Sequence, residues 1–253
     1  MNKLGLLGKD IGYSYSKKIH DFFLKKLDLK ATYQIIDLDE KDLEKQLVKL
    51  KSEEYLGYNV TIPYKEKILE FVQEKDELVA KLNACNTLLC KKNVIQAYNT
   101  DYYGFKYMIE ESKIDFNAKN VYILGTGASS KTVELVLSEL NCCYKFVSRT
   151  PINDQVSYEK INKDWVDIII NTTPVGSVNL NKRILDRTIV ENKIVFDLTY
   201  NPPQSLLIKD AKLGFNGLSM LIVQAFNSLK LWYGFDYMIT KKDIDDLKGE
   251  LLK

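Results

Sequence analysis

Apolar and polar positions alternate along the first hundred residues in a way that predicts alternating strands and helices. Apolar runs at 3–8, at 32–37 and up to 61 are typical of strands, and residues 16–28 carry apolar side chains at helical spacing. A helix is expected near 40–50, and Pro63 is placed to open another because proline is tolerated in a first helical turn. Two apolar runs between 86 and 98 predict a hairpin. A helix at 101–112 then leads into a second unit.

The second half repeats a βα alternation that is typical of a parallel sheet with right-handed crossovers. Expected strands lie at 121–125, 143–148, 166–171 and 193–198, with helices at 128–140 and 204–212. Two further helices, at 219–232 and 240–252, are expected to return to the first unit. The sequence therefore predicts a two-domain α/β protein: 1–101 with 219–253 as substrate domain, and 102–218 as Rossmann-type nucleotide domain.

Composition narrows the class of partner. The chain has 36 basic and 34 acidic residues, a formal charge of +2, and 45% apolar residues. These values suit an ordinary globular protein, and without a basic stripe they argue against nucleic acid as a partner. We find no apolar run long enough to span a membrane, and the four cysteines form no CxxC pair, as expected of free, buried thiols in the cytoplasm. A small metabolite is the expected partner, and no metal site is predicted.

A glycine-rich turn carries the nucleotide signal. The apolar strand at 121–124 runs directly into Gly125-Thr126-Gly127-Ala128-Ser129, and a helical pattern follows. In the dinucleotide fingerprint the first glycine permits the tight turn and the second lets the backbone approach the pyrophosphate. Ser130 fills the third position, where a small residue keeps strand and helix close. The helix N-terminus would offer its unpaired N–H groups to the phosphates.

The residues after the next strand indicate which dinucleotide is bound. An acidic residue there usually binds the ribose of NAD, whereas arginine accommodates the 2′-phosphate of NADP. This chain has Ser148, Arg149 and Thr150. With a planar guanidinium and no acid, the sequence favours NADP(H).

Five polar clusters remain, at 14–16, 59–65, 86–87, 99–101 and 217–224. They suit a small hydroxylated substrate, and together with the nucleotide signal they indicate a polyol oxidoreductase. In order and spacing, residues 11–16, 57–65, 83–87, 99–104, 171–176 and 217–224 resemble the shikimate dehydrogenase family over nearly the whole chain. The resemblance implies NADPH-dependent reduction of 3-dehydroshikimate to shikimate in chorismate biosynthesis, at a site between two domains.

The resemblance also assigns roles to residues. It implies Lys65 and Asp101 as the catalytic pair, with the Lys65 ammonium protonating the alkoxide that hydride delivery creates. Ser14, Ser16, Thr61 and Tyr200 would bind the carboxylate, while the amides of Asn59, Asn86 and Gln224 would both donate to and accept from the hydroxyls. The expected cofactor residues are Gly125, Thr126, Gly127, Ala128, Ser129, Ser148, Arg149, Thr150, Thr172, Thr173, Pro174, Val175, Gly217 and Met220.

Several positions depart from the family pattern. Tyr13 stands where histidine is common, Ala128 where glycine is usual, Ser148 where asparagine is usual, and Asn153 where a second basic residue often supports the 2′-phosphate. Some use of NAD is therefore expected as an alternative. A quinate or quinate/shikimate dehydrogenase using NAD would share the same polar clusters and is one rival interpretation, and a non-catalytic shikimate sensor is another. His20, the only histidine, lies beside Phe22 and Phe23 and is expected to be packed. The protein is expected to be a monomer or homodimer.

Overall fold

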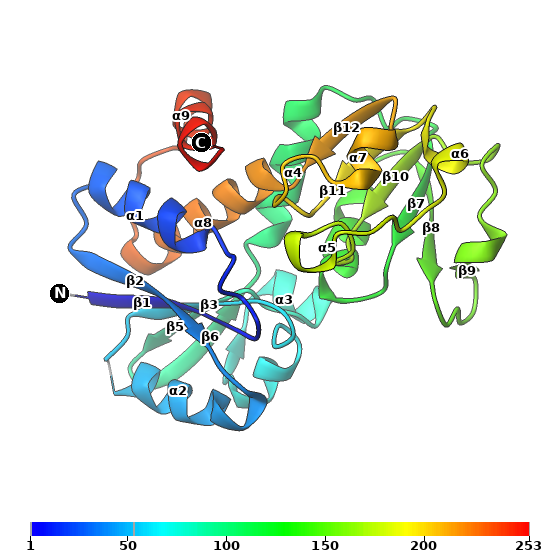
Figure 1. Ribbon diagram of the computed structural model, residues 1–253. Helices are drawn as coiled ribbons and strands as arrows, with labels where there is room; N and C mark the ends of the chain where they lie inside the picture. The colour runs from blue at the N-terminus through cyan, green and yellow to red at the C-terminus, as the bar shows by residue number, and fades with distance from the viewer. Residues whose placement is uncertain (1, 53, 253) are drawn as a thin grey trace. The chain divides into compact units, whose positions relative to one another are not determined.

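The protein divides into two compact units, 1–104 with 221–253, and 105–220. The computed structural model describes residues 2–52 and 54–252. The unit boundaries fall within a few residues of those expected at 101 and 218, and the C-terminal helices return to the first unit as predicted. Each unit is built on its own six-stranded sheet (Figure 1).

The first unit has a mixed sheet in the order β2-β1-β3-β5-β6-β4. Its parallel part consists of β1 (Asn2–Gly8), β2 (Ala31–Asp37) and β3 (Gly57–Val60). The expected hairpin is confirmed as β5 (Thr87–Lys91) and β6 (Val94–Tyr98), with β5 antiparallel to β3 and β4 (Glu74–Lys75) at the edge. Because β5 runs backwards, the ends of β1, β3 and β6 and the start of β5 meet at one edge of the sheet.

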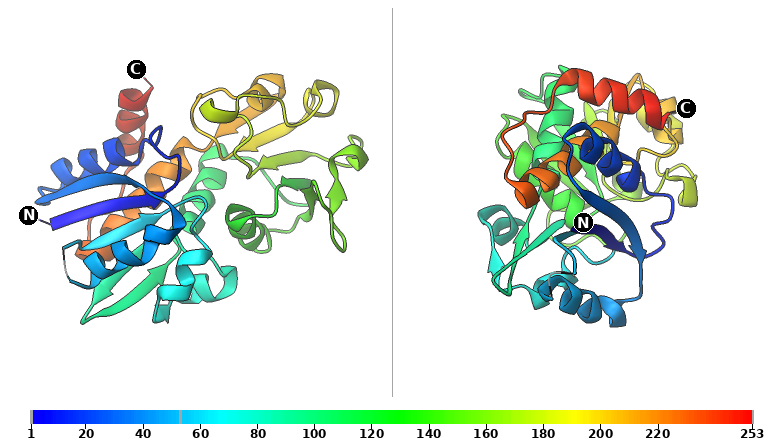
Figure 2. Two further views of the ribbon diagram at one scale, coloured as in Figure 1. Left: turned by 60° about the horizontal axis from the view of Figure 1, so that its bottom comes forward. Right: turned by 90° about the vertical axis from the view of Figure 1, so that its left-hand side faces the viewer.

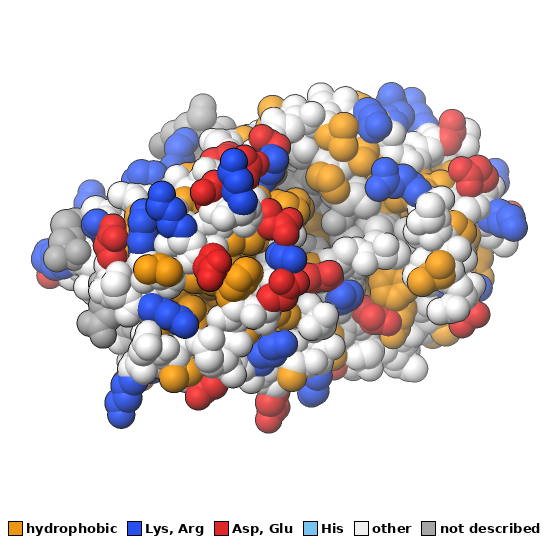
Figure 3. All heavy atoms as spheres, turned by 90° about the horizontal axis from the view of Figure 1, so that it is seen from below, with side chains coloured by type: hydrophobic (Ala, Val, Ile, Leu, Met, Phe, Trp, Pro, Cys, Tyr) orange, Lys and Arg blue, Asp and Glu red, His pale blue; other side chains and the backbone are white. Residues whose placement is uncertain are grey.

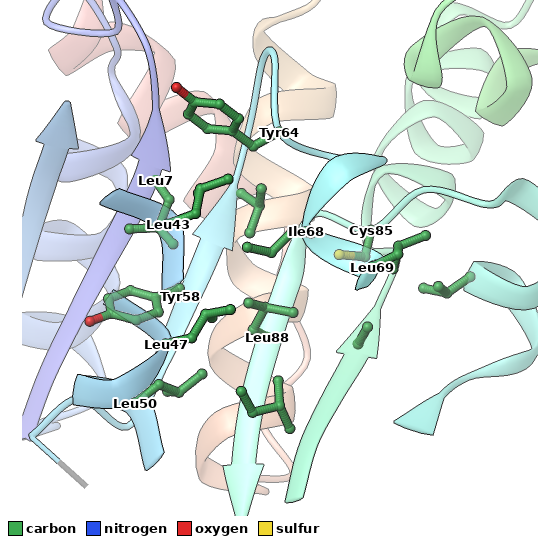
Figure 4. Packing of buried hydrophobic residues seen from close by; sticks show 14 of the residues in the cluster. Leu7, Leu43, Leu47, Leu50, Tyr58, Tyr64, Ile68, Leu69, Cys85 and Leu88 are labelled. Atoms are coloured by element: carbon green, nitrogen blue, oxygen red, sulfur yellow. The ribbon is translucent and has the colours of Figure 1, made fainter. Parts of the chain in front are cut away.

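Helices cover both faces of this sheet. On one face lies α2 (Leu43–Lys51), whose apolar residues at helical spacing pack on Tyr58, Ile68 and Leu88 (Figures 1 and 4). The other face carries α1 (Ser16–Lys26) and α8 (Leu218–Tyr233), and α9 (Lys241–Leu251) packs against α1. Since side chains alternate along β3, Tyr58 faces the α2 core while its neighbour Asn59 faces α1 and α8.

The last helix is fastened by one acidic residue. Asp243 closes a capping box with Thr240, accepts a hydrogen bond from the Tyr237 hydroxyl at 2.7 Å, and pairs with Lys26 of α1 at 2.5 Å. Figure 2 shows α9 lying beside α1. Burial opposes ionisation of Asp243, but these partners together hold its pKa well below the usual range.

The segment after β3 departs from the prediction. No helix begins at Pro63: the peptide bond between Ile62 and Pro63 is cis, and the chain turns there before a short 3-10 helix, η2 (Lys67–Phe71). The turn lets the Tyr64 N–H donate to the Thr61 carbonyl at 2.8 Å. The short helix α3 (Glu77–Leu82), which Asp76 caps, was not predicted from the sequence either. A 3-10 turn, η1 (Glu40–Asp42), precedes α2.

The second unit is a parallel sheet in the order β12-β11-β10-β7-β8-β9. Its strands are β7 (Asn120–Leu124), β8 (Cys143–Ser148), β9 (Val156–Ser157), β10 (Ile168–Asn171), β11 (Ile194–Asp197) and β12 (Leu213–Asn216). Its helices are α4 (Asp101–Ser112), whose first turn belongs to the other unit, α5 (Ala128–Leu137), α6 (Arg187–Val190) and α7 (Leu206–Asp210), with 3-10 turns η3 (Tyr158–Lys160) and η4 (Val178–Leu180).

This strand order is that of the Rossmann fold, in which the direction of connection reverses between β7 and β10. Alternate residues of β7 are buried on both of its faces, since Tyr122 and Leu124 join one core and Val121 and Ile123 are equally inaccessible. Parallel strands covered on both faces bind ligands at their carboxyl ends. The structure thus confirms the predicted two-domain α/β fold with a Rossmann-type unit.

Candidate active site

The predicted catalytic pair is formed within the first unit. Lys65 follows the turn after β3, and Asp101 is the first residue of α4. The Lys65 Nζ lies 2.5 Å from Asp101 Oδ2, and the two side chains are only 12% and 8% exposed. Asp101 lies at the N-terminus of α4, where the backbone dipoles favour negative charge. Lys65 and Asp101 thus form a close ion pair that is largely shielded from solvent.

An amide network surrounds this pair. Asn86 is 2% exposed and lies just before β5. Its Oδ1 accepts from the Thr100 N–H at 2.7 Å, while its Nδ2 lies 3.0 Å from both Asp101 Oδ1 and Gln224 Oε1. Gln224 comes from α8 and donates its own amide N–H to the Leu221 carbonyl. The structure therefore brings Lys65, Asp101, Asn86 and Gln224 together from four separate segments.

Asn59 is placed differently from the other two amides. It is 4% exposed, and its side chain contacts Tyr33, His20, Thr87 and Ser228. His20 is fully buried, as expected, and stacks on Tyr33 with ring centroids 3.8 Å apart. The sequence did not single out Tyr33 or Ser228, because neither lies in a recognisable motif.

The two serines lie in the loop after β1 and at the start of α1. The Ser14 hydroxyl donates to Ser16 Oγ at 3.0 Å and accepts from the Ser16 N–H at 3.2 Å, which leaves the Ser16 hydroxyl proton able to donate to a ligand. Asp37, at the end of β2, accepts from the backbone N–H groups of Asp10 and Ile11 and so holds this loop in place. Ser14 thus binds the first N–H of α1, while the side chain of the N-cap residue Tyr15 makes no capping hydrogen bond.

In the second unit the glycine-rich turn has the geometry that a dinucleotide requires. Gly125 has φ +103°, and a Cβ there would meet Thr172 Oγ1 at 2.9 Å, so only glycine fits between the loops after β7 and β10. At Gly127 a Cβ would meet nothing within 4 Å, which leaves room for an approaching phosphate. Gly127 is the N-cap of α5 and no side chain caps this end. The first N–H groups of α5, those of Ala128 and Ser129, have no partner within the helix.

The other expected cofactor residues lie at the same edge of the parallel sheet. Arg149 follows β8 and is exposed, and the neighbouring Thr150 N–H donates to Ser148 Oγ at 3.2 Å. After β10, the Thr172 hydroxyl donates to the Leu124 carbonyl at 2.7 Å and the Thr173 hydroxyl to Asn171 Oδ1 at 2.8 Å. Both loops are thus shaped by internal hydrogen bonds. Pro174 and Val175 continue the second of them.

A buried carboxylate supports the loop after β10. The Asn171 side chain donates to the Val175 carbonyl and to Asp197 Oδ1, both at 2.9 Å. Asp197 also accepts from Ser205 and from the Thr199 N–H; burial raises its pKa while these hydrogen bonds oppose the shift. Asp197 was not identified from the sequence, although its place at the carboxyl end of β11, the sheet edge that binds ligands, could have indicated it.

Three more of the expected site residues lie in the second unit, namely Gly217, Met220 and Tyr200. A Cβ at Gly217 would overlap the Leu198 carbonyl group, so close packing of the ends of β11 and β12 already requires glycine there. Met220 is buried in α8 at the end of the second unit. Tyr200 lies in the second unit, on the loop after β11, and its role at the substrate carboxylate stays a prediction.

Residues 2–52 and 54–252 contain neither a metal centre nor a membrane-spanning helix. Among these residues no cluster of three or more His, Cys, Asp or Glu could hold a metal ion, and no helix is long and apolar enough to cross a membrane. All four cysteines are free, but the expectation that they are buried holds only for Cys85: Cys90 and Cys142 are half-buried, and Cys143 is exposed at the start of β8. On the face in Figure 3 acidic and basic side chains are interspersed.

Two groups of residues have been described: those around Lys65 and Asp101 in the first unit, and the loops after β7, β8 and β10 in the second. With the fold, they define an oxidoreductase with a Rossmann-type dinucleotide unit. Residues 6–88 match the family model of the shikimate dehydrogenase substrate binding domain. A shikimate dehydrogenase (NADP(+)) of Clostridium botulinum strain Hall is 36% identical over 251 residues, covering 92% of this chain and 96% of that protein. Its counterpart in Caldicellulosiruptor bescii is 33% identical over 92% of this chain and 90% of its own length.

Solved structures agree with these sequences. Shikimate dehydrogenase 1 of Peptoclostridium difficile superposes with a TM-score of 0.90 at 30% identity and full coverage of both chains. A shikimate dehydrogenase solved in complex with NADP+ has a TM-score of 0.88 at 26% identity, covering 100% of this chain and 96% of that one. The chain therefore belongs to the shikimate dehydrogenase family, which confirms the resemblance found in the sequence.

Proposed function

We propose that this protein catalyses the reversible, NADP-dependent reduction of 3-dehydroshikimate to shikimate. The observation that carries the proposal is the buried Lys65–Asp101 pair, joined to Asn86 and Gln224 at one sheet edge. The names of the relatives support NADP as cofactor. The free cysteines suit a reducing compartment, and we propose the cytoplasm.

The bound cofactor supplies the hydride, and the residues of this chain handle the charge and the proton. As the ketone is reduced, negative charge grows on its oxygen, and Lys65 Nζ is the ammonium group that donates a hydrogen bond and then a proton to that oxygen. Asp101 Oδ2 keeps Nζ in place during the transfer and stabilises its positive charge before it. In the reverse direction Lys65 takes the proton from the alcohol.

The rest of the substrate is bound by two sets of groups. Ser14 and Ser16, at the N-terminus of α1, are suited to a carboxylate because hydroxyl donors and helix N–H groups both favour an anion. Thr61 is expected to add a third hydroxyl. Asn86 and Gln224 would bind the ring hydroxyls, which both donate and accept.

The fit of the cofactor rests on the second unit. The space at Gly127 and the uncapped start of α5 suit the pyrophosphate, while the exposed Arg149 after β8 suits the 2′-phosphate. Ala128 and Asn153, both departures from the family pattern, favour some use of NAD as a second possibility. A monomer or homodimer, without nucleic acid as partner, remains our expectation.

Initial rates test the proposal directly. Shikimate and quinate would each be combined with NADP+ and with NAD+, and formation of the reduced nicotinamide followed by absorbance. Rapid turnover with shikimate and NADP+ supports the proposal. A clear preference for quinate and NAD+ would replace it with a quinate dehydrogenase, and shikimate binding without turnover would make the protein a sensor.

A further inference from the structure

Asn59 has no hydrogen-bonding capacity left for a ligand. Its Oδ1 accepts from the Tyr33 hydroxyl at 2.8 Å and from His20 Nε2 at 3.0 Å. Its Nδ2 lies 3.1 Å from the Asn86 carbonyl oxygen and 2.8 Å from Ser228 Oγ. Thr87 Oγ1 also lies 3.1 Å from Nδ2. Since a side-chain amide offers two lone pairs and two N–H groups, these five partners saturate it. Asn59 therefore does not have the free donor and acceptor that a substrate contact needs.

The orientation of this amide is fixed by its partners. The Asn86 carbonyl oxygen can only accept, so the nitrogen of Asn59 faces it and the oxygen faces the two rings. His20 Nε2 must then carry the proton, and Nδ1 is a buried lone pair with no partner among the described residues. Burial lowers the pKa of His20 to about 3, although the bond to Asn59 opposes this. The neutral ring, stacked on Tyr33, thus presents one fixed donor.

On its other side Asn59 holds the residues expected to contact the substrate. It fastens the backbone carbonyl of Asn86, whose side chain reaches Asp101 Oδ1 and Gln224 Oε1, both at 3.0 Å. A shift of the Asn86 backbone would therefore move the amide that touches the catalytic carboxylate. Reactive groups misplaced by about 1 Å can lower turnover about 100-fold.

A second branch runs from Asn59 to helix α8. The Ser228 hydroxyl donates to the Gln224 carbonyl at 3.0 Å, so its lone pairs are free to accept. They accept from Asn59 Nδ2 and from the Thr87 hydroxyl, each at 2.8 Å. The turn of α8 that carries Gln224 is thus tied to β3 through the Asn59 amide and to the start of β5 through the Thr87 hydroxyl.

We propose that Asn59 is a positioning residue, held from behind by Tyr33 and His20, which fixes Asn86 and the Gln224 turn of α8 for the reaction. This inference rests on the proposed function, because Asn86 and Gln224 matter only if they bind the substrate. It gives Asn59 a role other than the substrate contact that the sequence suggested.

Two tyrosines provide a matched test. Both Tyr33 and Tyr58 are buried, at 1% and 0% exposure, but only the Tyr33 hydroxyl donates to Asn59, whereas the Tyr58 hydroxyl has no partner among the described residues. We expect Tyr33→Phe to lower kcat/KM for shikimate about 3- to 10-fold and Tyr58→Phe to change it less than about twofold. Asn59→Leu should lower it by about 100-fold.

The Kd for NADP+ separates positioning from general damage, since the cofactor residues belong to the other unit. It should stay within about twofold of the wild-type value in all three variants. Equal kcat/KM values for the two phenylalanine variants, or a parallel loss of NADP+ binding, would overturn the inference.

The tautomer of His20 gives a second readout that needs no turnover. In tag-free protein labelled with ¹⁵N-histidine, the single ring should appear as the neutral Nε2–H form from about pH 5 to about pH 9. A ring that titrates near its ordinary value of about 6.5, or an Nδ1–H form, would contradict the network.

Failure of the proposed function can be distinguished from failure of the inference about Asn59. If wild-type protein binds shikimate without turnover, the enzyme assignment fails. The inference is then tested by the Kd for shikimate, which Tyr33→Phe should raise more than Tyr58→Phe does; equal Kd values would overturn it. If wild-type protein neither binds nor oxidises shikimate, both proposals fall together.

Discussion

Mild acid should destabilise the first unit through one buried imidazole. His20 is 0% exposed, and burial lowers its pKa from the ordinary 6.5 to about 3 in the folded protein. As the pH falls below about 6.5, the unfolded chain binds a proton at this residue and the folded chain does not. The free energy of unfolding should therefore decrease as the pH falls, over a window from about 6.5 to about 3.

The size of the effect follows from the shift. Each pKa unit corresponds to about 1.4 kcal/mol, so the full loss approaches about 5 kcal/mol near pH 3. At pH 5, above the range where ordinary carboxylates titrate, the loss is about 2 kcal/mol relative to neutral pH. This is a large share of the 5–15 kcal/mol, roughly, that stabilises a typical protein.

Urea denaturation at about pH 7.5 and about pH 5 measures this loss. The chain has two tryptophans, and a Trp165→Phe background leaves Trp232, which lies beside His20, as the only fluorescent reporter. The control is His20→Gln, whose amide can still donate toward Asn59 but does not titrate. The wild-type protein should lose about 2 kcal/mol more than the variant. Equal losses would show that His20 is not held neutral, and would refute the reasoning.

Four further predictions concern single side chains. Lys65→Ala should lower kcat about 10²- to 10⁴-fold with little change in NADP+ binding, whereas Lys67→Ala, which removes only two exposed ion pairs, should keep near-normal rates. Arg149→Leu should raise KM for NADP+ about tenfold or more and leave KM for NAD+ unchanged; equal shifts would remove Arg149 from 2′-phosphate recognition. Gly125→Ala should weaken NADP+ binding in calorimetry, because its φ of +103° and the nearby loop exclude a methyl group. Asp243→Asn should lower the melting temperature at neutral pH. The difference from wild type should shrink as the pH falls below about 4, because the partners that lower the pKa of Asp243 stabilise the folded protein only while this carboxyl group is ionised.

Local patterns were sufficient for most of the fold. The helix at 101–112, the hairpin between 86 and 98 and the strand before Gly125 were predicted because periodicity and turn residues lie within a few positions of one another. The helix expected at Pro63 was wrong, because a proline that can open a helix also fits a turn. The shortest elements, such as α3, carry too few residues for a pattern to appear.

What the sequence determined by itself is the kind of element at each place and the set of polar residues at the ends of the strands. Only the tertiary structure decided what each amide contacts. Asn59 and Asn86 are the same residue type in similar polar motifs, yet the hydrogen bonds of Asn59 are all internal while Asn86 borders the catalytic pair. The reason is that hydrogen bonding is settled by atoms brought from distant segments: the partner Ser228 lies 169 positions beyond Asn59. No local pattern in the sequence can reveal such a bond, because its two partners come together only in the folded protein.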